Sequence, residues 1–275
     1  MGLKYRLGFI GAGNMALAIA DSVVKAGLYK GTEIIASDIT GDRRDLFSDQ
    51  IGAAVTDQND EVMRQAALVI LAIKPQQAKD VLKPLAGLAG NRQIIVSIMA
   101  GVCTDIIEKI LGPEAAVIRV MPNLAIRVGA GMTAIAKGAR ANDGHVKMVE
   151  KLFQSCGKTV LVEEEQMHAV TAVSGSGPAY FFYFVEALIE AGKKAGLSQQ
   201  QAELLAKQTC LGAAKSLFNG EQSPAELRQA VTSKGGTTAA ALAIMEEAKL
   251  AEIIGRAVSA AVKRSKELSE LAGGK

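Results

Sequence analysis

The stretch LGFIGAGNMALAI near the N-terminus constrains the fold of this chain more than any other feature. It sets Gly11, Gly13 and Ala16 in a G-x-G-x-x-A pattern that directly follows a strand-like run and opens a helix-like run. The first glycine permits a tight turn, the second lets the backbone approach a pyrophosphate, and the small third residue lets helix and strand pack closely. The helix N-terminus then offers free N–H groups to phosphates. In this context the pattern predicts a dinucleotide site rather than a mere strand-to-helix turn.

Short apolar runs alternate with amphipathic segments from residue 4 to about residue 162. The strand candidates are YRLGFI, EIIAS, LVILAI, QIIVSI and AVIRVM. Such alternation indicates a parallel sheet covered by helices on both faces. From about residue 165 onward no convincing strand pattern appears, and alanine, leucine and lysine dominate. We therefore expect an α/β, Rossmann-like dinucleotide-binding domain over residues 1–164 and an all-helical domain over residues 165–275.

One expected helix, over residues 178–195, is unusual in its composition. Its run AYFFYFVEALIEAG is apolar around much of the helix circumference. Such a helix should be buried, either in the core of its own domain or against another subunit. Both possibilities remain open at this point.

An acidic residue follows the second strand candidate. Asp38 lies 25 residues beyond Gly13, near where a carboxylate would bind the adenosine ribose hydroxyls of NAD. Arg43 and Arg44 come soon after, and they could instead bind the 2′-phosphate of NADP or simply face solvent at a helix start. The choice between NAD and NADP therefore stays open.

Composition excludes several classes of function. The net charge is only +3 and is spread over both halves, and aromatic residues make up 4%, which argues against a nucleic-acid partner. The three cysteines show no paired spacing for metal or redox work. The apolar run AALVILAI is too short to span a bilayer, and no signal-type segment precedes the glycine motif. We expect a soluble cytoplasmic protein with no membrane partner and no bound metal.

The stretch AVTSKGGTTAAAL carries an unusually polar helix start. Residues 233–238, hereafter the α-start segment, hold three hydroxyl side chains and two adjacent glycines directly before an alanine-rich run. A helix N-terminus with several N–H groups and hydroxyls suits a small anion, above all a carboxylate. The alternative is simple N-capping by Ser233 or Thr237. The chain has only two histidines, His145 and His168, and neither stands in a catalytic pattern, so the chemistry must need little proton transfer by side chains.

The segment PAELRQAVTSKGGTTAAALAIME resembles the signature of the pyrroline-5-carboxylate reductases. FIGAGNMA, AIKP, SIMAGV and AVTAVSGSGPAY match the same family in order and spacing. The resemblance implies a Rossmann-like domain followed by a helical dimerisation domain, with homodimers assembled into larger rings. It also implies that NADPH or NADH reduces 1-pyrroline-5-carboxylate to L-proline, the last step of proline biosynthesis. A protonated cyclic imine needs only a positioned nicotinamide, a held carboxylate and one hydrogen-bond donor at nitrogen.

The resemblance also implies roles for particular residues. The pyrophosphate is expected at Gly11, Ala12, Gly13, Asn14 and Met15, the adenosine end near Asp38 and Asn59, and the nicotinamide half along Ala72, Lys74 and Ala100. The substrate is expected at Ser233, Gly236, Thr237 and Thr238, with Glu164 as a further candidate, and Thr238 is expected to face the imine nitrogen as the catalytic residue. Some positions depart from the family pattern, namely Leu124 and Ala125, Ala130, and His168.

Two other functions compete with this one. A β-hydroxyacid dehydrogenase would carry a lysine and an asparagine in the helix after SGSG, where this chain has Phe181 and Val185. Lys215 and Asn219 have that spacing but belong to a later helix. A nucleotide sensor without turnover would have no evident need for the α-start segment.

Overall fold

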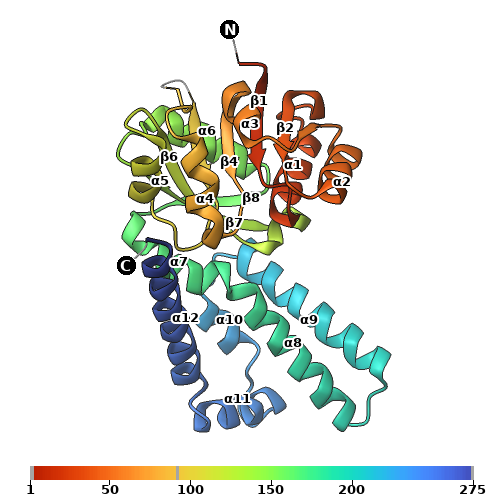
Figure 1. Cartoon of the computed structure of the whole chain (residues 1–275). Coiled ribbons are helices and arrows are strands. Elements are labelled where there is room, and N and C mark those ends of the chain that lie inside the picture. Colours follow the sequence, from red (N-terminus) through yellow and green to blue (C-terminus); the bar gives the residue numbers. More distant parts are fainter. Residues whose placement is uncertain (1–2, 91–92, 274–275) are drawn as a thin grey trace. The chain divides into compact units, whose positions relative to one another are not determined.

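The computed structural model describes residues 3–90 and 93–273, and the chain divides into two compact units (Figure 1). The first unit comprises Met1–Ser176 together with Ala260–Lys275, and the second comprises Gly177–Ser259. The first unit is built on a sheet, and the second consists of helices.

The described part of the first unit contains an eight-stranded sheet in the order β3-β2-β1-β4-β5-β6-β7-β8. Neighbouring strands run parallel, except that β7 is antiparallel to β6. After β1 the chain moves outward to β2 and β3 and then returns to pair β4 with β1. This reversal makes the β1/β4 junction the topological switch point, where doubly wound sheets bind ligands. The strands are β1 (Tyr5–Ile10), β2 (Ile34–Ser37), β3 (Ala54–Thr56), β4 (Ala66–Leu71), β5 (Ile94–Ser97), β6 (Ala116–Pro122), β7 (Gly131–Lys137) and β8 (Gly157–Leu161).

Helices cover both faces of this sheet, as the alternating pattern predicts (Figure 1). Phe9 packs in one apolar cluster with residues of α1, α2 and α6, whereas the next residue, Ile10, packs in a second cluster with residues of α3, α4 and α5. Successive side chains of a strand point to opposite faces, so a strand buried on both sides reads as a continuous apolar run. The helices of this unit are α1 (Asn14–Lys25), α2 (Gly41–Ile51), α3 (Asn59–Gln65), α4 (Ala78–Leu82), α5 (Thr104–Leu111), α6 (Asp143–Gln154) and the short α7 (Met167–Val170).

The α/β fold class is confirmed, but three strands were not expected from the sequence. All five strand candidates form, as β1, β2, β4, β5 and β6. The strands that were missed are β3, which has only three residues, β7, and the edge strand β8. β7 reads GMTAIAK, where glycine and alanine replace the β-branched residues that mark a strand. The five expected strands run parallel, as predicted, and the antiparallel pairing in the sheet is the one between β6 and the unexpected β7.

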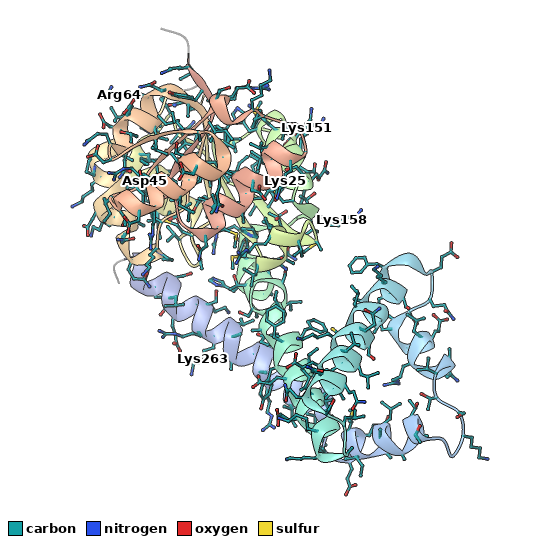
Figure 2. All side chains as sticks on the ribbon, turned by 90° about the vertical axis from the view of Figure 1, so that its right-hand side faces the viewer. Lys25, Asp45, Arg64, Lys151, Lys158 and Lys263 are labelled. Atoms are coloured by element: carbon teal, nitrogen blue, oxygen red, sulfur yellow. The ribbon has the colours of Figure 1, made fainter. Side chains whose placement is uncertain are left out.

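The second unit is helical throughout its described residues, as expected. It contains α8 (Gly177–Lys194), α9 (Gln199–Asn219), α10 (Pro224–Ala230), α11 (Thr237–Glu247) and the first part of α12 (Leu250–Gly273). Ser198 and Ser223 begin α9 and α10 with reciprocal capping boxes. Many side chains of this unit project into open space (Figure 2).

The large side chains of α8 are exposed in the single chain. Phe181 is 66% exposed and Tyr183 is 74% exposed, and Phe182 and Phe184 are also exposed. The interpretation of this helix as an ordinary core helix is therefore wrong, because its own unit does not cover it. A contiguous apolar surface of this kind is typical of a subunit interface.

The two compact units divide the chain at other positions than the domain boundary expected after residue 164. Met167 of α7 is fully buried against Ala134 and Ala136 of β7, which ties the residues after 164 to the first unit. The end of α12 also returns to this unit, where Ser265 Oγ lies 2.9 Å from His168 Nδ1. Helix α12 thus belongs to both units.

Candidate functional site

The glycine loop after β1 has the geometry that phosphate binding requires. Gly11 has φ +98°, and a Cβ there would lie 2.6 Å from the carbonyl oxygen of Ala72, so only glycine fits. Gly13 differs, because a Cβ there would meet nothing within 4 Å. Gly13 is also the N-cap of α1, and no side chain caps the helix. The first N–H groups of α1 thus have no side-chain cap beside an open position at Gly13, and this arrangement fits a pyrophosphate.

The Asp38 carboxylate lies at the end of β2 and contacts the glycine loop itself. Asp38 Oδ2 accepts a hydrogen bond from Ala12 N at 3.0 Å, and Oδ1 accepts one from Thr40 N at 3.0 Å. Arg43 Nη1 lies 3.6 Å from Oδ2, and Arg44 donates to the Asp38 carbonyl oxygen at 2.7 Å. The carboxylate thus holds the glycine loop in place.

The remaining expected cofactor residues gather at the same sheet edge. Asn59, the first residue of α3, accepts a hydrogen bond from Ser37 Oγ at 2.7 Å, which places it beside the end of β2. Ala72 N donates to Ile10 O at 2.8 Å, so Ala72 lies beside the glycine loop. Lys74 is exposed two residues further on, and Ala100 follows the end of the neighbouring β5. The carboxyl ends of β1, β2, β4 and β5 thus bring together the residues expected for the cofactor.

The α-start segment forms a tight turn into α11. Gly235 has φ +73°, a conformation that favours glycine, and a Cβ at Gly236 would displace the Ser233 hydroxyl. Gly236 is the N-cap and lacks a side-chain cap, which means that the simple N-capping interpretation is wrong. Ser233 and Thr237 are exposed and Thr238 is half-buried. The N–H groups of the first turn and these hydroxyls are together available to an anion.

Glu164 has its observed partners in the first unit. Its carboxylate accepts hydrogen bonds from Thr104 N at 2.8 Å and Thr104 Oγ1 at 2.5 Å, and Arg119 Nη1 lies 3.3 Å from Oε1. Glu164 and the α-start segment belong to different compact units. Sequence reasoning missed Thr104 and Arg119, although a charged residue inside the apolar strand AVIRVM was an available signal.

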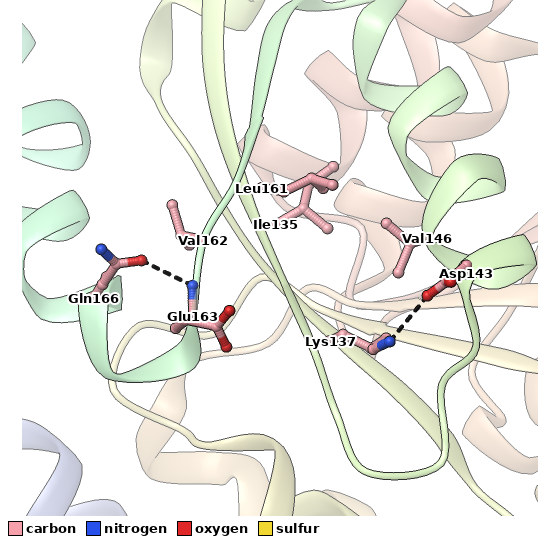
Figure 3. A pocket seen from close by; sticks show the side chains of 8 residues that line it. All are labelled: Ile135, Lys137, Asp143, Val146, Leu161, Val162, Glu163 and Gln166. Atoms are coloured by element: carbon pink, nitrogen blue, oxygen red, sulfur yellow. Dashed lines mark hydrogen bonds and ion pairs between the residues drawn. The ribbon is translucent and has the colours of Figure 1, made fainter.

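Two hollows lie mostly away from these residues, although Asn14 lines the smaller one. The larger, of about 310 Å³, is lined by residues of β7, β8 and α6 and of the turn after β8 (Figure 3). Its Lys137 pairs with Asp143 at 2.9 Å, and Gln166 accepts a hydrogen bond from Glu163 N, so these polar groups already have partners. The second, of about 180 Å³, lies along α1 and is lined by Asn14, Leu17, Ala18, Asp21, Gln50 and Arg127.

Among the described residues no cluster of acidic, histidine or cysteine side chains could hold a metal ion, and no helix is long and apolar enough to cross a membrane.

Known proteins match this chain over nearly its full length. A family model described as pyrroline-5-carboxylate reductase dimerisation matches residues 164–268, and one described as NADP oxidoreductase, coenzyme F420-dependent, matches residues 6–101. A pyrroline-5-carboxylate reductase from Synechocystis sp. is 41% identical and covers 98% of this chain and 100% of its own length. The chain belongs to the pyrroline-5-carboxylate reductase family.

Solved structures of pyrroline-5-carboxylate reductases agree with this assignment. The enzyme from Coxiella burnetii is 38% identical, with a TM-score of 0.90, over 97% of this chain and 99% of that one. The enzyme from Plasmodium falciparum, solved with NADP bound, is 29% identical with a TM-score of 0.87, over 98% of this chain and 100% of that one. A 3-hydroxyisobutyrate dehydrogenase from Mycobacterium tuberculosis is only 14% identical with a TM-score of 0.51, which shows a shared fold alone.

Proposed function

We propose that this chain reduces 1-pyrroline-5-carboxylate to L-proline with NADPH or NADH. The observation that carries the proposal is a pair of helix N-termini that, in a member of this family, lack side-chain caps and directly follow glycine-containing segments of the family pattern. One follows the glycine loop at the switch point of the sheet, and the other is the hydroxyl-rich start of α11. The first suits a dinucleotide pyrophosphate, and the second suits a small carboxylate.

The first unit supplies the cofactor site. The backbone of residues 11–15 would hold the pyrophosphate, Asp38 and Asn59 would meet the adenosine end, and Ala72, Lys74 and Ala100 would line the nicotinamide half. The open space at Gly13 lets a phosphate approach the backbone. When bound, the reduced nicotinamide supplies the hydride. The relative from Plasmodium falciparum was solved with NADP, which favours this class of cofactor for the present chain.

The α-start segment supplies the substrate site. The N–H groups of the first turn of α11, with Ser233 and Thr237, would hold the substrate carboxylate. The Thr238 hydroxyl would donate a hydrogen bond to the lone pair that develops on nitrogen as the hydride adds to the carbon of the protonated imine and the neutral amine forms. No histidine is needed for this step, because the imine is electrophilic once it carries a proton.

The exposed α8 supports assembly of this chain into homodimers. Its aromatic side chains lie within the region that matches the dimerisation model. Assembly of dimers into rings, a cytoplasmic location and the lack of nucleic-acid or membrane partners stay predictions from the sequence.

An absorbance assay tests the proposal with purified protein. Oxidation of NADPH or NADH should require 1-pyrroline-5-carboxylate and should yield proline. Thr238→Ala should lower kcat by about ten- to a hundredfold, or roughly 1.4 to 2.7 kcal/mol at the transition state, because a donor at the reacting centre is lost. Thr238→Ser should recover much of the rate.

A matched control variant, Thr232→Ala, accompanies the test of Thr238. Thr232 donates its hydroxyl to Arg228 O at 2.6 Å, so Thr232→Ala should leave kcat unchanged. If Thr238→Ala raised only the KM for the imine, Thr238 would be a binding residue. If folded wild-type protein bound NADPH but oxidised none with the imine present, the reductase function would be rejected in favour of a nucleotide sensor.

A further inference from the structure

Glu164 caps a helix that begins 60 residues before it in the chain. Thr104 is the first residue of α5, and Cys103, the N-cap, makes no side-chain cap. Both oxygens of the Glu164 carboxylate instead accept hydrogen bonds, one from Thr104 N and one from Thr104 Oγ1. A carboxylate at this place satisfies a backbone donor and interacts favourably with the positive end of the helix dipole. The start of α5 is therefore fixed by a distant residue.

Arg119 in turn fixes Glu164. The Arg119 side chain is only 1% exposed, and Glu164 is its observed ion-pair partner, at 3.3 Å. Nη2 of Arg119 has no hydrogen-bond partner among the described residues. Nη1 also contacts Cys103 Sγ at 3.7 Å, but burial raises the pKa of the Cys103 thiol, so the sulfur does not compensate the charge. A buried guanidinium with one counter-ion depends strongly on it.

These contacts fix the segment that is expected to line the nicotinamide. Residues 98–103 connect the end of β5 to the start of α5 and contain Ala100. At one end of the segment stands Thr104, held by Glu164. In its middle, a Cβ at Gly101 would lie 3.2 Å from Ser269 N, so Gly101 packs directly on the backbone of α12. The segment is also held by the buried side chains of Met99 and Val102 and by the hydrogen bond from Ile98 N to Leu71 O at 3.2 Å, and of these anchors the contact with Glu164 is the one that depends on charge.

We propose that Arg119 and Glu164 are positioning residues that hold residues 98–103 against the nicotinamide half of the cofactor. This inference rests on the proposed function and assigns Glu164 a role other than substrate contact. The pair does not touch the reacting atoms. It acts through Thr104, and so its loss should displace the cofactor rather than the imine. Small displacements at a hydride-transfer site lower the rate strongly.

Steady-state kinetics with Glu164→Gln distinguish a positioning role of Glu164 from direct contact with the substrate. We expect the KM for NADPH to rise about fivefold and kcat to fall about tenfold, with the KM for the imine within about twofold of wild type. Thr104→Val, which removes only the hydroxyl contact, should move the same two parameters by about two- to threefold. In the double variant the effects should be less than multiplicative, because both changes break the same contact. Glu165→Gln neutralises the neighbouring exposed carboxylate and should leave all three parameters unchanged.

Direct titration of NADPH by fluorescence keeps this test independent of turnover. The Kd for NADPH should rise in both single variants even if the enzyme reduced some other substrate, so failure of the proposed function would not conceal this result. A Glu164→Gln protein with a raised KM for the imine and an unchanged Kd for NADPH would overturn the inference and make Glu164 a substrate residue. Variants with wild-type kinetics and only a lower Tm would also overturn it. If Glu164→Gln failed to fold, Thr104→Val would decide by the same criteria.

Discussion

We expect the Asp38 carboxylate to combine two tasks at the cofactor edge. A carboxylate after the second strand commonly binds the ribose hydroxyls and repels a 2′-phosphate. In this chain the same group also accepts hydrogen bonds from Ala12 N and Thr40 N. Spacing along the sequence predicts the first task, whereas the second appears only when the loop geometry is known. We therefore expect a substitution at Asp38 to change both the cofactor preference and the order of the glycine loop.

Variants of Asp38 should separate these tasks. Asp38→Asn keeps an oxygen that can accept from Ala12 N but loses the charge, so the ratio of kcat/KM for NADPH over NADH should rise about tenfold. Asp38→Ser should give a similar change in the ratio, and it should also raise the KM for both cofactors, because serine does not reach Ala12 N. Steady-state kinetics with both cofactors check these values. An unchanged ratio in both variants would show that Asp38 does not face the ribose and would favour Arg43 and Arg44.

At the scale of elements, the strands with continuous apolar runs were predictable, whereas the buried but glycine- and alanine-containing β7 and the exposed β8 were not. The inner strands β1, β4 and β5 read as continuous apolar runs because helices cover both of their faces. The edge strand β8 reads GKTVL and is largely exposed, so no periodic apolar pattern marks it. The features of the candidate site also fall into those that the sequence predicts and those that it does not. Glycine motifs reveal the backbone turns, but the contact between Glu164 and Thr104 joins residues too far apart in the chain for spacing to indicate.

The contact between α7 and α12 should make stability depend on pH. Burial, followed by the charges of Arg119 and Lys266, lowers the pKa of His168 below 6.5, while Glu164 acts in the opposite direction. The folded state thus favours the neutral ring, which lies 2.9 Å from Ser265 Oγ. This contribution is present above the unfolded pKa of about 6.5 and is lost as the pH falls toward the lower folded pKa.

Thermal unfolding of His168→Gln tests this dependence. Between about pH 7.5 and pH 5.5 the wild-type Tm should fall by about 1 to 2 °C more than the Tm of the variant, a small effect because the ring is partly exposed. His145, whose side chain is on the surface at the start of α6, provides the control. His145→Gln should keep the wild-type dependence on pH. If the Tm of wild type and the Tm of His168→Gln depended on pH in the same way, the lowered pKa of His168 would be contradicted.

At the scale of the whole molecule, the packing of a single chain does not explain the apolar sequence of α8. Apolar residues all around a helix predict burial, yet Phe181, Phe182 and Tyr183 are exposed in the single chain. The structure leaves only the second of the two expected places for this helix, against another subunit, and sequence periodicity does not name that partner. A second copy of the chain, paired through the region that matches the dimerisation model, would resolve the difference.

A charge placed on α8 should therefore break both assembly and activity. Tyr183→Glu puts a carboxylate into the proposed interface, where desolvation without a partner is costly, so the protein should elute from a sizing column as a monomer. Because the cofactor site lies within the first unit, the monomer should still bind NADPH with a Kd within about threefold of wild type, while kcat for the imine falls at least about a hundredfold. Met148→Glu replaces an exposed apolar residue of α6 and should change neither property. A Tyr183→Glu protein that remained dimeric would place the interface elsewhere, and an active monomer would show that one chain completes the site without its partner.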